Sequence, residues 1–230
     1  MSEPASSSQR VLGLFAKAPR PGQVKTRLAA AVSTDWAAAV AEAFLHDTIH
    51  RILTVEARLT LYFSPPHERP YFEAIAPPGF MLAPQVEGDL GCRMAAFFKE
   101  QFGQGAGQVV LVGSDSPTLP MDYVKKAFKL LRQHEIVLGP AIDGGYYLIG
   151  CAREMPTIFE RTPWGTSQVL HATISAIQHA GYRFTLLPRW YDVDTLDDWR
   201  MLQDEVTAKR ELGLNPGIPQ TERLLQESEP

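Results

Sequence analysis

Short apolar runs alternate along the chain with longer segments in which apolar residues recur every three or four positions. Unbroken apolar runs rich in β-branched residues are typical of strands buried on both faces of a parallel sheet. Recurrence at three and four positions is typical of helices with one apolar face. Together the two patterns predict an α/β domain. The predicted strands lie at residues 11–16, 58–63, 109–112, 135–139 and about 182–187, and the predicted helices at 26–31, about 35–53, 71–76, 92–101, 120–134, 168–180 and from 195 onward.

The stretch 109–120 joins the clearest of these strands to an abruptly polar segment. Four consecutive apolar residues, 109–112, precede residues 113–117, which contain Asp115 and no large apolar side chain. In open α/β sheets, ligands bind beyond the carboxyl ends of the strands. We therefore predict that Asp115 binds a divalent metal ion. The alternative is an ordinary turn or helix cap, because Asp and Ser also serve these roles after strands.

The loop after the first predicted strand, residues 17–27, is strongly basic. It carries four cations and no acidic residue, and its prolines and Gly22 prevent a regular helix. A cationic loop that leads into a helix N-terminus suits an anion, above all a polyphosphate. The loop lacks the glycines that precede the Lys of a Walker A motif, and the alternative is a solvated basic turn. The four cations are Lys17, Arg20, Lys25 and Arg27.

A second acidic segment, residues 192–198, precedes the last long predicted helix. Asp192 and Asp194 alternate around Val193, so they share one face if this segment is extended. The residues from Thr195 to Asp198 form a variant capping box. Capping, with Asp194 or Thr195 as N-cap, is the alternative to a metal site. Carboxylates on separate elements nevertheless suit Mg²⁺, with phosphates and water as the remaining ligands.

Three further loops have both structural and functional interpretations. In residues 85–91, Gly88 and Gly91 permit close approach to a ligand, but the segment also fits a helix start with Asp89 near the cap. Residues 143–145 predict a tight turn between two strands, followed by two tyrosines that suit a small-molecule pocket. At 164–167, Thr166 or Ser167 predicts an N-cap at a helix end that attracts anions.

Length and composition restrict the class of protein. The 230 residues, with 45% hydrophobic and 21% charged residues, suit one globular α/β domain. We expect a tail at residues 1–10, a domain at 11–210 and a C-terminal extension at 211–230. The net charge of −4 argues against general nucleic-acid binding. Two distant cysteines and the absence of a long apolar segment favour a cytoplasmic protein without a membrane span.

Six motifs in this order resemble the glycosyltransferase-A-like nucleotidyltransferase superfamily, and within it a bacterial branch related to the 2-phospho-lactate guanylyltransferases. They are FAKAPRPGQVKTRL (15–28), QVEGDLGCRM (85–94), GSDSPTLP (113–120), DGGYY (143–147), WGT (164–166) and DVDTLDD (192–198). The resemblance extends from residue 11 to about residue 200. It implies a single three-layer α/β/α domain with a mixed, mainly parallel sheet, the nucleotide-diphospho-sugar transferase fold.

The resemblance also implies roles for individual residues. Asp115 would be the first metal ligand and Asp194 the second, with Asp192 as the substitute, for Mg²⁺ or Mn²⁺. The catalytic residues would be Asp115, through the metal ion, and Lys17, Lys25 and Arg27, which would offset charge on the leaving pyrophosphate. The nucleotide would contact Phe15, Ala16, Lys17, Arg20, Lys25, Arg27, Gln85, Gly88, Asp89, Gly91 and Ser114. The acceptor would contact Asp143, Gly144, Gly145, Tyr146, Tyr147, Trp164, Gly165, Thr166 and Ser167.

The activity implied is metal-dependent transfer of a nucleoside monophosphate from a nucleoside triphosphate to a small phosphorylated acceptor, by a monomer or homodimer. Two alternatives stay open: a glycosyltransferase with a nucleotide-sugar donor and a sugar-like acceptor, and a non-catalytic nucleotide-binding module. Neither nucleic acid nor a membrane is an expected partner. An aspartyl-phosphate phosphatase is disfavoured, because its nucleophilic Asp follows the first strand, whereas the DVDT segment at 192–195 lies near the end of the chain.

Overall fold

The computed structural model describes residues 9–160 and 162–227. Its centre is a seven-stranded sheet with the order β3-β2-β1-β4-β6-β5-β7. Neighbouring strands are parallel except where β6 pairs with β4 and β5. The sheet is therefore mixed and mainly parallel, as predicted. The strands are β1 (Gln9–Lys17), β2 (Arg58–Ser64), β3 (Met81–Pro84), β4 (Ala106–Gly113), β5 (Ile136–Pro140), β6 (Tyr146–Cys151) and β7 (Phe184–Leu186).

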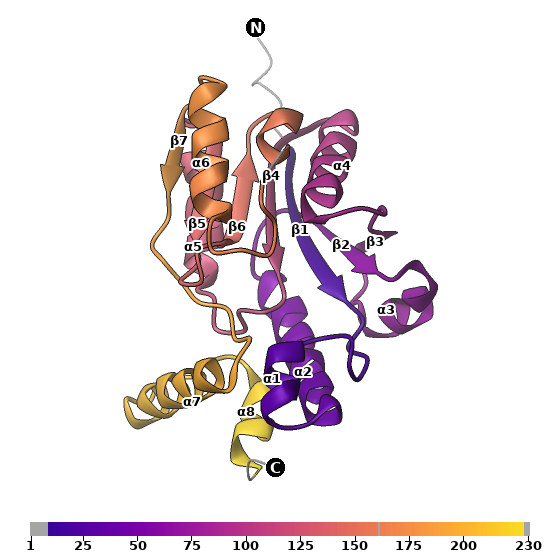
Figure 1. Cartoon of the computed structure of the whole chain (residues 1–230), viewed down its shortest axis with the longest axis vertical. Coiled ribbons are helices and arrows are strands. Elements are labelled where there is room, and N and C mark those ends of the chain that lie inside the picture. The colour runs from indigo at the N-terminus through magenta and orange to yellow at the C-terminus, as the bar shows by residue number, and fades with distance from the viewer. Residues whose placement is uncertain (1–8, 161, 228–230) are drawn as a thin grey trace, which may run out of the picture.

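Helices cover both faces of the sheet and confirm the three-layer arrangement (Figure 1). Helices α2, α3 and α5 pack on one face, and α4 and α6 pack on the other. The helices are α1 (Thr26–Ala31), α2 (Thr34–Ile52), α3 (Arg69–Ile75), α4 (Leu90–Gly103), α5 (Met121–Leu130), α6 (Val169–His179), α7 (Leu196–Glu211) and α8 (Pro219–Gln226), with short 3₁₀ turns η1 (Pro66–Glu68) and η2 (Pro156–Phe159).

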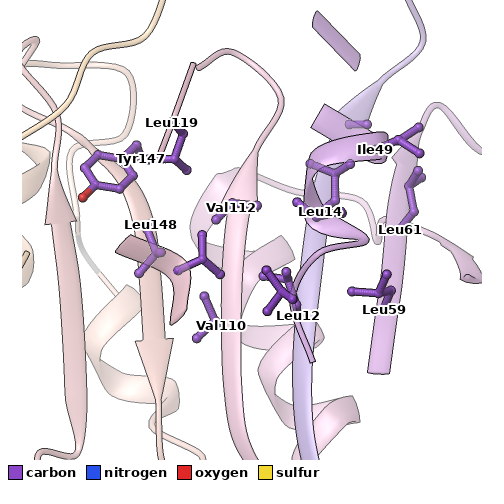
Figure 2. Close-up of a cluster of buried hydrophobic side chains, with 14 of the residues drawn as sticks. Leu12, Leu14, Ile49, Leu59, Leu61, Val110, Val112, Leu119, Tyr147 and Leu148 are labelled. Atoms are coloured by element: carbon purple, nitrogen blue, oxygen red, sulfur yellow. The ribbon is translucent and has the colours of Figure 1, made fainter. Parts of the chain in front are cut away.

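The apolar runs of the sequence become strands whose side chains alternate between two cores. On β1, Leu12 and Leu14 enter the core beneath α2, where they meet Leu61 of β2 and Val112 of β4 (Figure 2). Residues of the opposite parity enter the core beneath α4. Burial on both faces explains why these strands are continuously apolar rather than alternating with polar residues.

Gly13 has a packing role in the second core. A Cβ atom at this position would lie 2.4 Å from the ring of Phe97 on α4. Phe97 also packs edge-to-face against Phe15 and Tyr62, with ring centroids 5.6 and 4.9 Å away. The absence of a side chain at Gly13 therefore lets α4 lie close to β1, beside the end of the strand that leads into the basic loop.

A third apolar cluster joins α1, α2, α7 and α8 below the carboxyl ends of β1 and β2 (Figure 1). Its centre is Trp199 of α7, which packs against Trp36 and Phe44 of α2. The buried Asp47 of α2 accepts hydrogen bonds from the backbone N–H groups of Gln220 and Thr221, at 3.1 and 2.8 Å. The residues beyond 210 thus contain a helix that is attached to the domain.

Several boundaries differ from those predicted. Strand β1 includes Gln9 and Arg10, which were expected in the tail, and the rest of that tail lies outside the described residues. The edge strand β3 and helix α8 were not predicted, and α5 ends at Leu130 rather than near residue 134. The tight turn at 143–145 does join two antiparallel strands, β5 and β6. Within the part of the chain that is described, no helix is both long and apolar enough to cross a membrane.

Candidate active site

The loop after β4 and the segment before α7 lie side by side at the carboxyl edge of the sheet. The backbone N–H of Val193 donates to the carbonyl oxygen of Asp115, with an N···O distance of 2.9 Å. This hydrogen bond holds the 192–194 segment against the end of β4. Asp115 and Asp194 are thereby brought to one place although 79 residues separate them in the sequence.

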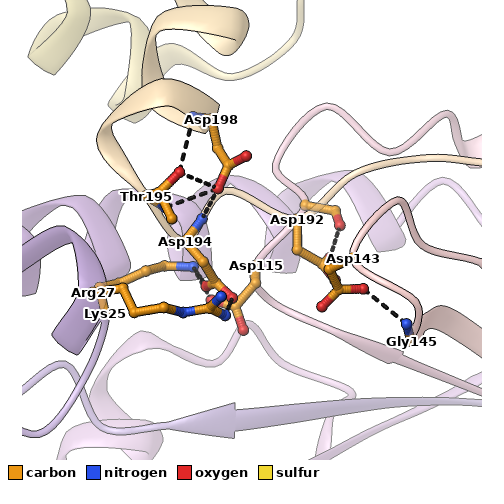
Figure 3. Close-up of polar contacts among 10 residues, drawn as sticks. Lys25, Arg27, Asp115, Asp143, Gly145, Asp192, Asp194, Thr195 and Asp198 are labelled. Atoms are coloured by element: carbon orange, nitrogen blue, oxygen red, sulfur yellow. Dashed lines mark hydrogen bonds and ion pairs between the residues drawn. The ribbon is translucent and has the colours of Figure 1, made fainter. Parts of the chain in front are cut away.

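Lys25 lies between the two aspartates (Figure 3). Its Nζ forms an ion pair with Asp115 Oδ1 and lies 3.3 Å from Asp194 Oδ1. The Lys25 side chain is only 2% exposed. Burial opposes its charge, but the attraction of Asp115 and Asp194 is larger in sum and raises the pKa of Lys25. The ammonium group is therefore charged, and it lies between the two acids with the ring of Phe44 5.2 Å away.

The start of α7 leaves the Asp194 carboxylate available to the site. Thr195 is the N-cap, and its hydroxyl accepts from the N–H of Asp198 in a reciprocal capping box. The capping role that was the alternative for Asp194 thus falls to Thr195. The Asp194 carboxylate turns instead to Lys25 and to Arg27, whose guanidinium lies 2.7 Å from Oδ2.

Asp192 has a different environment from its neighbour. Its carboxylate accepts a hydrogen bond from the hydroxyl of Ser116. Burial raises the pKa of Asp192 to about 7, and the charges of Asp115 and Asp194 contribute to the shift. Ser116 was not singled out from the sequence. The geometry favours Asp194 over Asp192 as the partner of Asp115, because Asp194 is the carboxylate that shares Lys25 with it.

The acid cluster forms part of the wall of a cavity of about 430 Å³. The basic loop contributes Lys17 and Lys25, and β6 contributes Tyr146 and Tyr147. Gln85 also lines the cavity and donates from Nε2 to the carbonyl oxygen of Tyr62 at 2.8 Å. The volume and the mixture of cationic, amide and aromatic groups suit a nucleotide-sized ligand. The other predicted residues that line the cavity are Phe15, Ala16, Ser114, Asp115, Asp192 and Asp194.

The site residues fit a metal ion that is shared with a substrate. Mg²⁺ in nucleotide sites is held by one or two carboxylates, with phosphates and water completing the octahedron. Asp115 and Asp194 provide two carboxylates, and their side chains are 52% and 30% exposed. Their oxygens already hold a cationic group, the Lys25 ammonium. Among the described residues, no group of three or more His, Cys, Asp or Glu side chains could hold a metal ion unaided.

Arg20 and the start of α4 lie in structural interactions. Arg20 forms a two-pronged ion pair with Glu68 of η1 and does not line the cavity. Asp89 is the N-cap of α4 and accepts from the N–H of Cys92 at 2.8 Å, which is the structural interpretation of that loop. A Cβ atom at Gly91 would lie 2.4 Å from Trp164 Nε1. Gly91 and Trp164 therefore pack against each other, outside the cavity lining.

The predicted acceptor residues divide into two groups. Tyr146 and Tyr147 line the cavity, although Tyr147 is 5% exposed and its hydroxyl donates to the carbonyl oxygen of Pro188. The turn residues lie beside the loop before α6, because a Cβ atom at Gly144 would meet the carbonyl oxygen of Ser167 at 2.2 Å. That loop does not line the cavity.

The prediction that Thr166 or Ser167 is the N-cap of α6 was wrong. Gln168 is the N-cap of this helix and has no side-chain capping bond. The hydroxyl of Thr166 accepts from the N–H of Gln168, two residues later, at 3.2 Å. Asp143 lines a smaller cavity of about 190 Å³, which shares Asp192 and Asp194 with the main cavity.

Arg93 is a cavity residue that sequence reasoning missed. It lies in the first turns of α4, and its guanidinium donates to Gln85 Oε1 at 3.0 Å and to the carbonyl oxygen of Gly88 at 3.0 Å. The sequence contained a signal for this residue, since Arg93 lies inside the motif at residues 85–94 that was expected to contact the nucleotide. Its orientation depends on the turn at Gly88, which has a positive φ of 112°.

Comparison with known proteins agrees with this fold. Residues 48–166 match the family described as DUF2064, uncharacterized protein conserved in bacteria. The chain is similar to a candidate nucleotide-diphospho-sugar transferase from Desulfovibrio desulfuricans G20, with 32% identity, a TM-score of 0.85 and coverage of 95% of this chain and 97% of that one. No curated protein matches the chain.

Two more distant structures share the fold. A CMP:2-keto-3-deoxy-manno-octonic acid synthetase in complex with CTP has 11% identity and a TM-score of 0.56, over 90% of this chain and all of that one. Rv0371c of Mycobacterium tuberculosis H37Rv in complex with manganese has 16% identity and a TM-score of 0.51, over 86% of this chain and 98% of that one. The fold is that of the nucleotide-diphospho-sugar transferases.

Proposed function

The chain belongs to the DUF2064 family of bacterial proteins, and from its fold and site we propose that it is a metal-dependent nucleotidyltransferase. It transfers a nucleoside monophosphate from a nucleoside triphosphate to a small phosphorylated acceptor. One observation carries the proposal: Asp115, Asp194 and Lys25 converge in the wall of a cavity of nucleotide size. The structural neighbours that bind CTP and manganese support it.

The chain positions the triphosphate and offsets its charge. The phosphates lie against Lys17 and Lys25, and the rest of the nucleotide extends toward Gln85 and Arg93. Arg27 lines the smaller adjoining cavity and adds positive charge beside Asp194. A Mg²⁺ or Mn²⁺ ion held by Asp115 and Asp194 supplies further charge neutralisation at the phosphates when it is bound. The attraction between these cationic groups and the phosphates is stronger in a partly enclosed cavity, because water screens the charges less there than in bulk solution.

The reaction needs no nucleophile from the protein. An acceptor oxygen attacks the α-phosphorus of the nucleotide. The bond from that phosphorus to the oxygen bridging to the β-phosphate breaks, and the electron pair leaves with pyrophosphate. Lys17 and Lys25 offset the charge that develops on the leaving group, so that positioning and electrostatics account for the rate.

Substitution of Asp115 tests the proposal. We expect Asp115→Ala to lower pyrophosphate release by at least about 100-fold, because one of the two metal-holding carboxylates is lost. The readout is pyrophosphate formed from each nucleoside triphosphate across a panel of phosphorylated acceptors. Asp122→Ala is the control, since Asp122 is also an acid after this loop but its side chain is 90% exposed on α5. Pyrophosphate release by Asp115→Ala at the unsubstituted rate would refute the proposal.

A second candidate keeps the site but uses a nucleotide sugar as donor. It is favoured by the similarity to the Desulfovibrio protein, whose description is that of a nucleotide-diphospho-sugar transferase. The two activities differ in the leaving group. Nucleotidyl transfer releases pyrophosphate, whereas glycosyl transfer releases a nucleoside diphosphate, so chromatography of the products distinguishes them.

A further inference from the structure

The position of Lys25 has a consequence for the order in which ligands bind. Its ammonium group contacts Asp115 Oδ1 and lies 3.3 Å from Asp194 Oδ1. These are the carboxylates to which the proposed function assigns a metal ion. The ammonium and a divalent cation would repel each other strongly at such separations. Both cannot share the two facing oxygen atoms at once.

The backbone of Lys25 is arranged to place the ammonium there. Lys25 is the N-cap of α1 and has φ 48° and ψ 44°, in the left-handed region. Within residues 9–160 and 162–227 it is the one non-glycine residue with positive φ. Side-chain-bearing residues adopt this conformation at an energetic cost, so it persists where other interactions compensate. The ion pairs of the buried Lys25 ammonium with Asp115 and Asp194 provide that compensation.

Lys25 also lines the main cavity, where a second partner for its charge can bind. A triphosphate in the cavity offers the ammonium an anion outside the aspartate pair. Lysine suits such an exchange, because its point charge sits on a flexible stem. Lys17 lines the same cavity but donates to the carbonyl oxygen of Gln23 at 2.7 Å, away from the carboxylates. Arg27 pairs with Asp194 alone, through Oδ2 at 2.7 Å, so Lys25 is the cation that lies between the two carboxylates.

We propose that Lys25 is the resident counter-ion of the Asp115–Asp194 pair and couples metal binding to nucleotide binding. Without nucleotide, the ammonium occupies the carboxylates and weakens binding of a divalent cation. A bound triphosphate draws the ammonium to its phosphates and frees the two carboxylates for the metal. The coupling is reciprocal, so the metal strengthens nucleotide binding by the same factor. This inference rests on the proposed function, because it assumes that the two aspartates hold a metal ion.

The test measures protein-bound Mn²⁺ by water-proton relaxation, which requires no catalytic turnover. Titrations use Mn²⁺ alone and Mn²⁺ with each of the four ribonucleoside triphosphates. The variant is Lys25→Met, which keeps an unbranched side chain, one atom shorter, and removes its charge. The matched control is Lys17→Met, a lysine of the same cavity that does not contact the aspartates. Far-ultraviolet circular dichroism verifies that each variant is folded.

We expect Lys25→Met to bind Mn²⁺ alone at least about ten-fold more tightly than the unsubstituted chain, and Lys17→Met to stay within about two-fold of it. In the unsubstituted chain, at least one nucleotide should strengthen Mn²⁺ binding at least about ten-fold. In Lys25→Met this enhancement should be at least about three-fold smaller than in the unsubstituted chain, because only the part due to phosphate oxygens that bind the metal directly remains.

Equal affinities for Mn²⁺ alone in the unsubstituted chain and in Lys25→Met would overturn the role of Lys25 while leaving the metal site in place. If Lys25→Met does not fold, the titrations of the unsubstituted chain still test the coupling. A Mn²⁺ affinity that none of the nucleotides changes would overturn it. Absence of protein-bound Mn²⁺ in every titration would instead refute the metal site of the proposed function, and this inference with it.

Discussion

At the scale of single residues, the neighbouring acids Asp194 and Asp192 differ in their partners. Asp194 shares Lys25 and Arg27, whereas Asp192 has the Ser116 hydroxyl as its hydrogen-bond partner. Burial without an equal opposite charge disfavours ionisation. The raised pKa of Asp192, about 7, is the result.

This pKa predicts how Asp192 affects stability across pH. An unfolded Asp ionises near pH 4, so between about pH 4 and pH 7 the folded state retains a proton that the unfolded state loses. The stability contributed by the protonated carboxyl therefore falls as pH rises through this interval. Asp192→Asn, which cannot ionise, should become more stable than the unsubstituted chain by up to about 4 kcal/mol at pH 8, with little difference at pH 4.

Urea unfolding at both pH values, in metal-free buffer, measures the effect on Asp192. Asp122→Asn, on an exposed residue of α5, controls for the loss of a carboxylate. A difference between Asp192→Asn and the unsubstituted chain that is the same at pH 4 and pH 8 would contradict the assignment.

Sequence patterns identified the residues that carry charge but not how those residues pair. Asp115 and Asp194 were expected at one site because each lies at the edge of a predicted element. The place of Lys25 between them depends on its own left-handed backbone conformation. It also depends on contacts with Asp115 and Asp194, which lie 90 and 169 positions away in the sequence. Arg20 looked equivalent to Lys25 in the basic loop, yet Glu68, 48 residues away, holds it outside the cavity.

At the scale of elements, α7 connects the two acid-bearing loops. Its Glu205 accepts from the hydroxyl of Tyr191 and from Thr118 Oγ1, the latter at 3.0 Å. Thr118 follows Asp115 by three residues, and Tyr191 precedes Asp192. Thr118 and Tyr191 are 1% and 8% exposed, so water has little access to their hydroxyl groups. One carboxylate of α7 therefore fixes both loops.

Glu205→Ala should destabilise the fold by about 1–3 kcal/mol, because Thr118 and Tyr191 lose their carboxylate acceptor and keep only the 3.4 Å contact between their own hydroxyl groups. It should also raise the metal concentration needed for half-maximal pyrophosphate release, since the two loops are no longer held together. Urea unfolding and a metal titration of activity measure the two effects. Asp204→Ala changes an exposed neighbour on the same helix and should alter neither. A loss of stability in Glu205→Ala without any change in the metal requirement would show that the contact serves the fold alone.

Elements with strong patterns were predicted, and short elements that depend on context were not. The buried strands β1, β2, β4 and β5 follow from their apolar runs. Strand β3 has four residues, none fully buried, at the edge of the sheet. Helix α8 has only eight residues, and its first turn is held by Asp47, which lies 173 residues before Gln220. Pairings over such distances have no local signature.

At the scale of the whole molecule, the site lies where three packing clusters meet. Strands β1 and β4 are neighbours in the sheet, and Phe15 pairs with Gly113 at their carboxyl ends. The α1–α2–α7–α8 cluster then holds the basic loop and the 192–194 segment against that edge. This arrangement follows the general rule that ligands bind outside the carboxyl ends of the strands in open α/β sheets. It also explains why residues from the two ends of the chain form one cavity.

The measurement that tests the central claim most directly is the melting temperature with each nucleoside triphosphate, with and without Mg²⁺ or Mn²⁺. A ligand that binds only the folded state stabilises it, by about 2.7 kcal/mol at 100 times its dissociation constant. We expect at least one nucleotide to raise the melting temperature more with the metal than without it, and Asp115→Ala to lose this metal-dependent part. If no nucleotide raises the melting temperature of the unsubstituted chain in the presence of either metal, the nucleotide site proposed for this cavity is wrong.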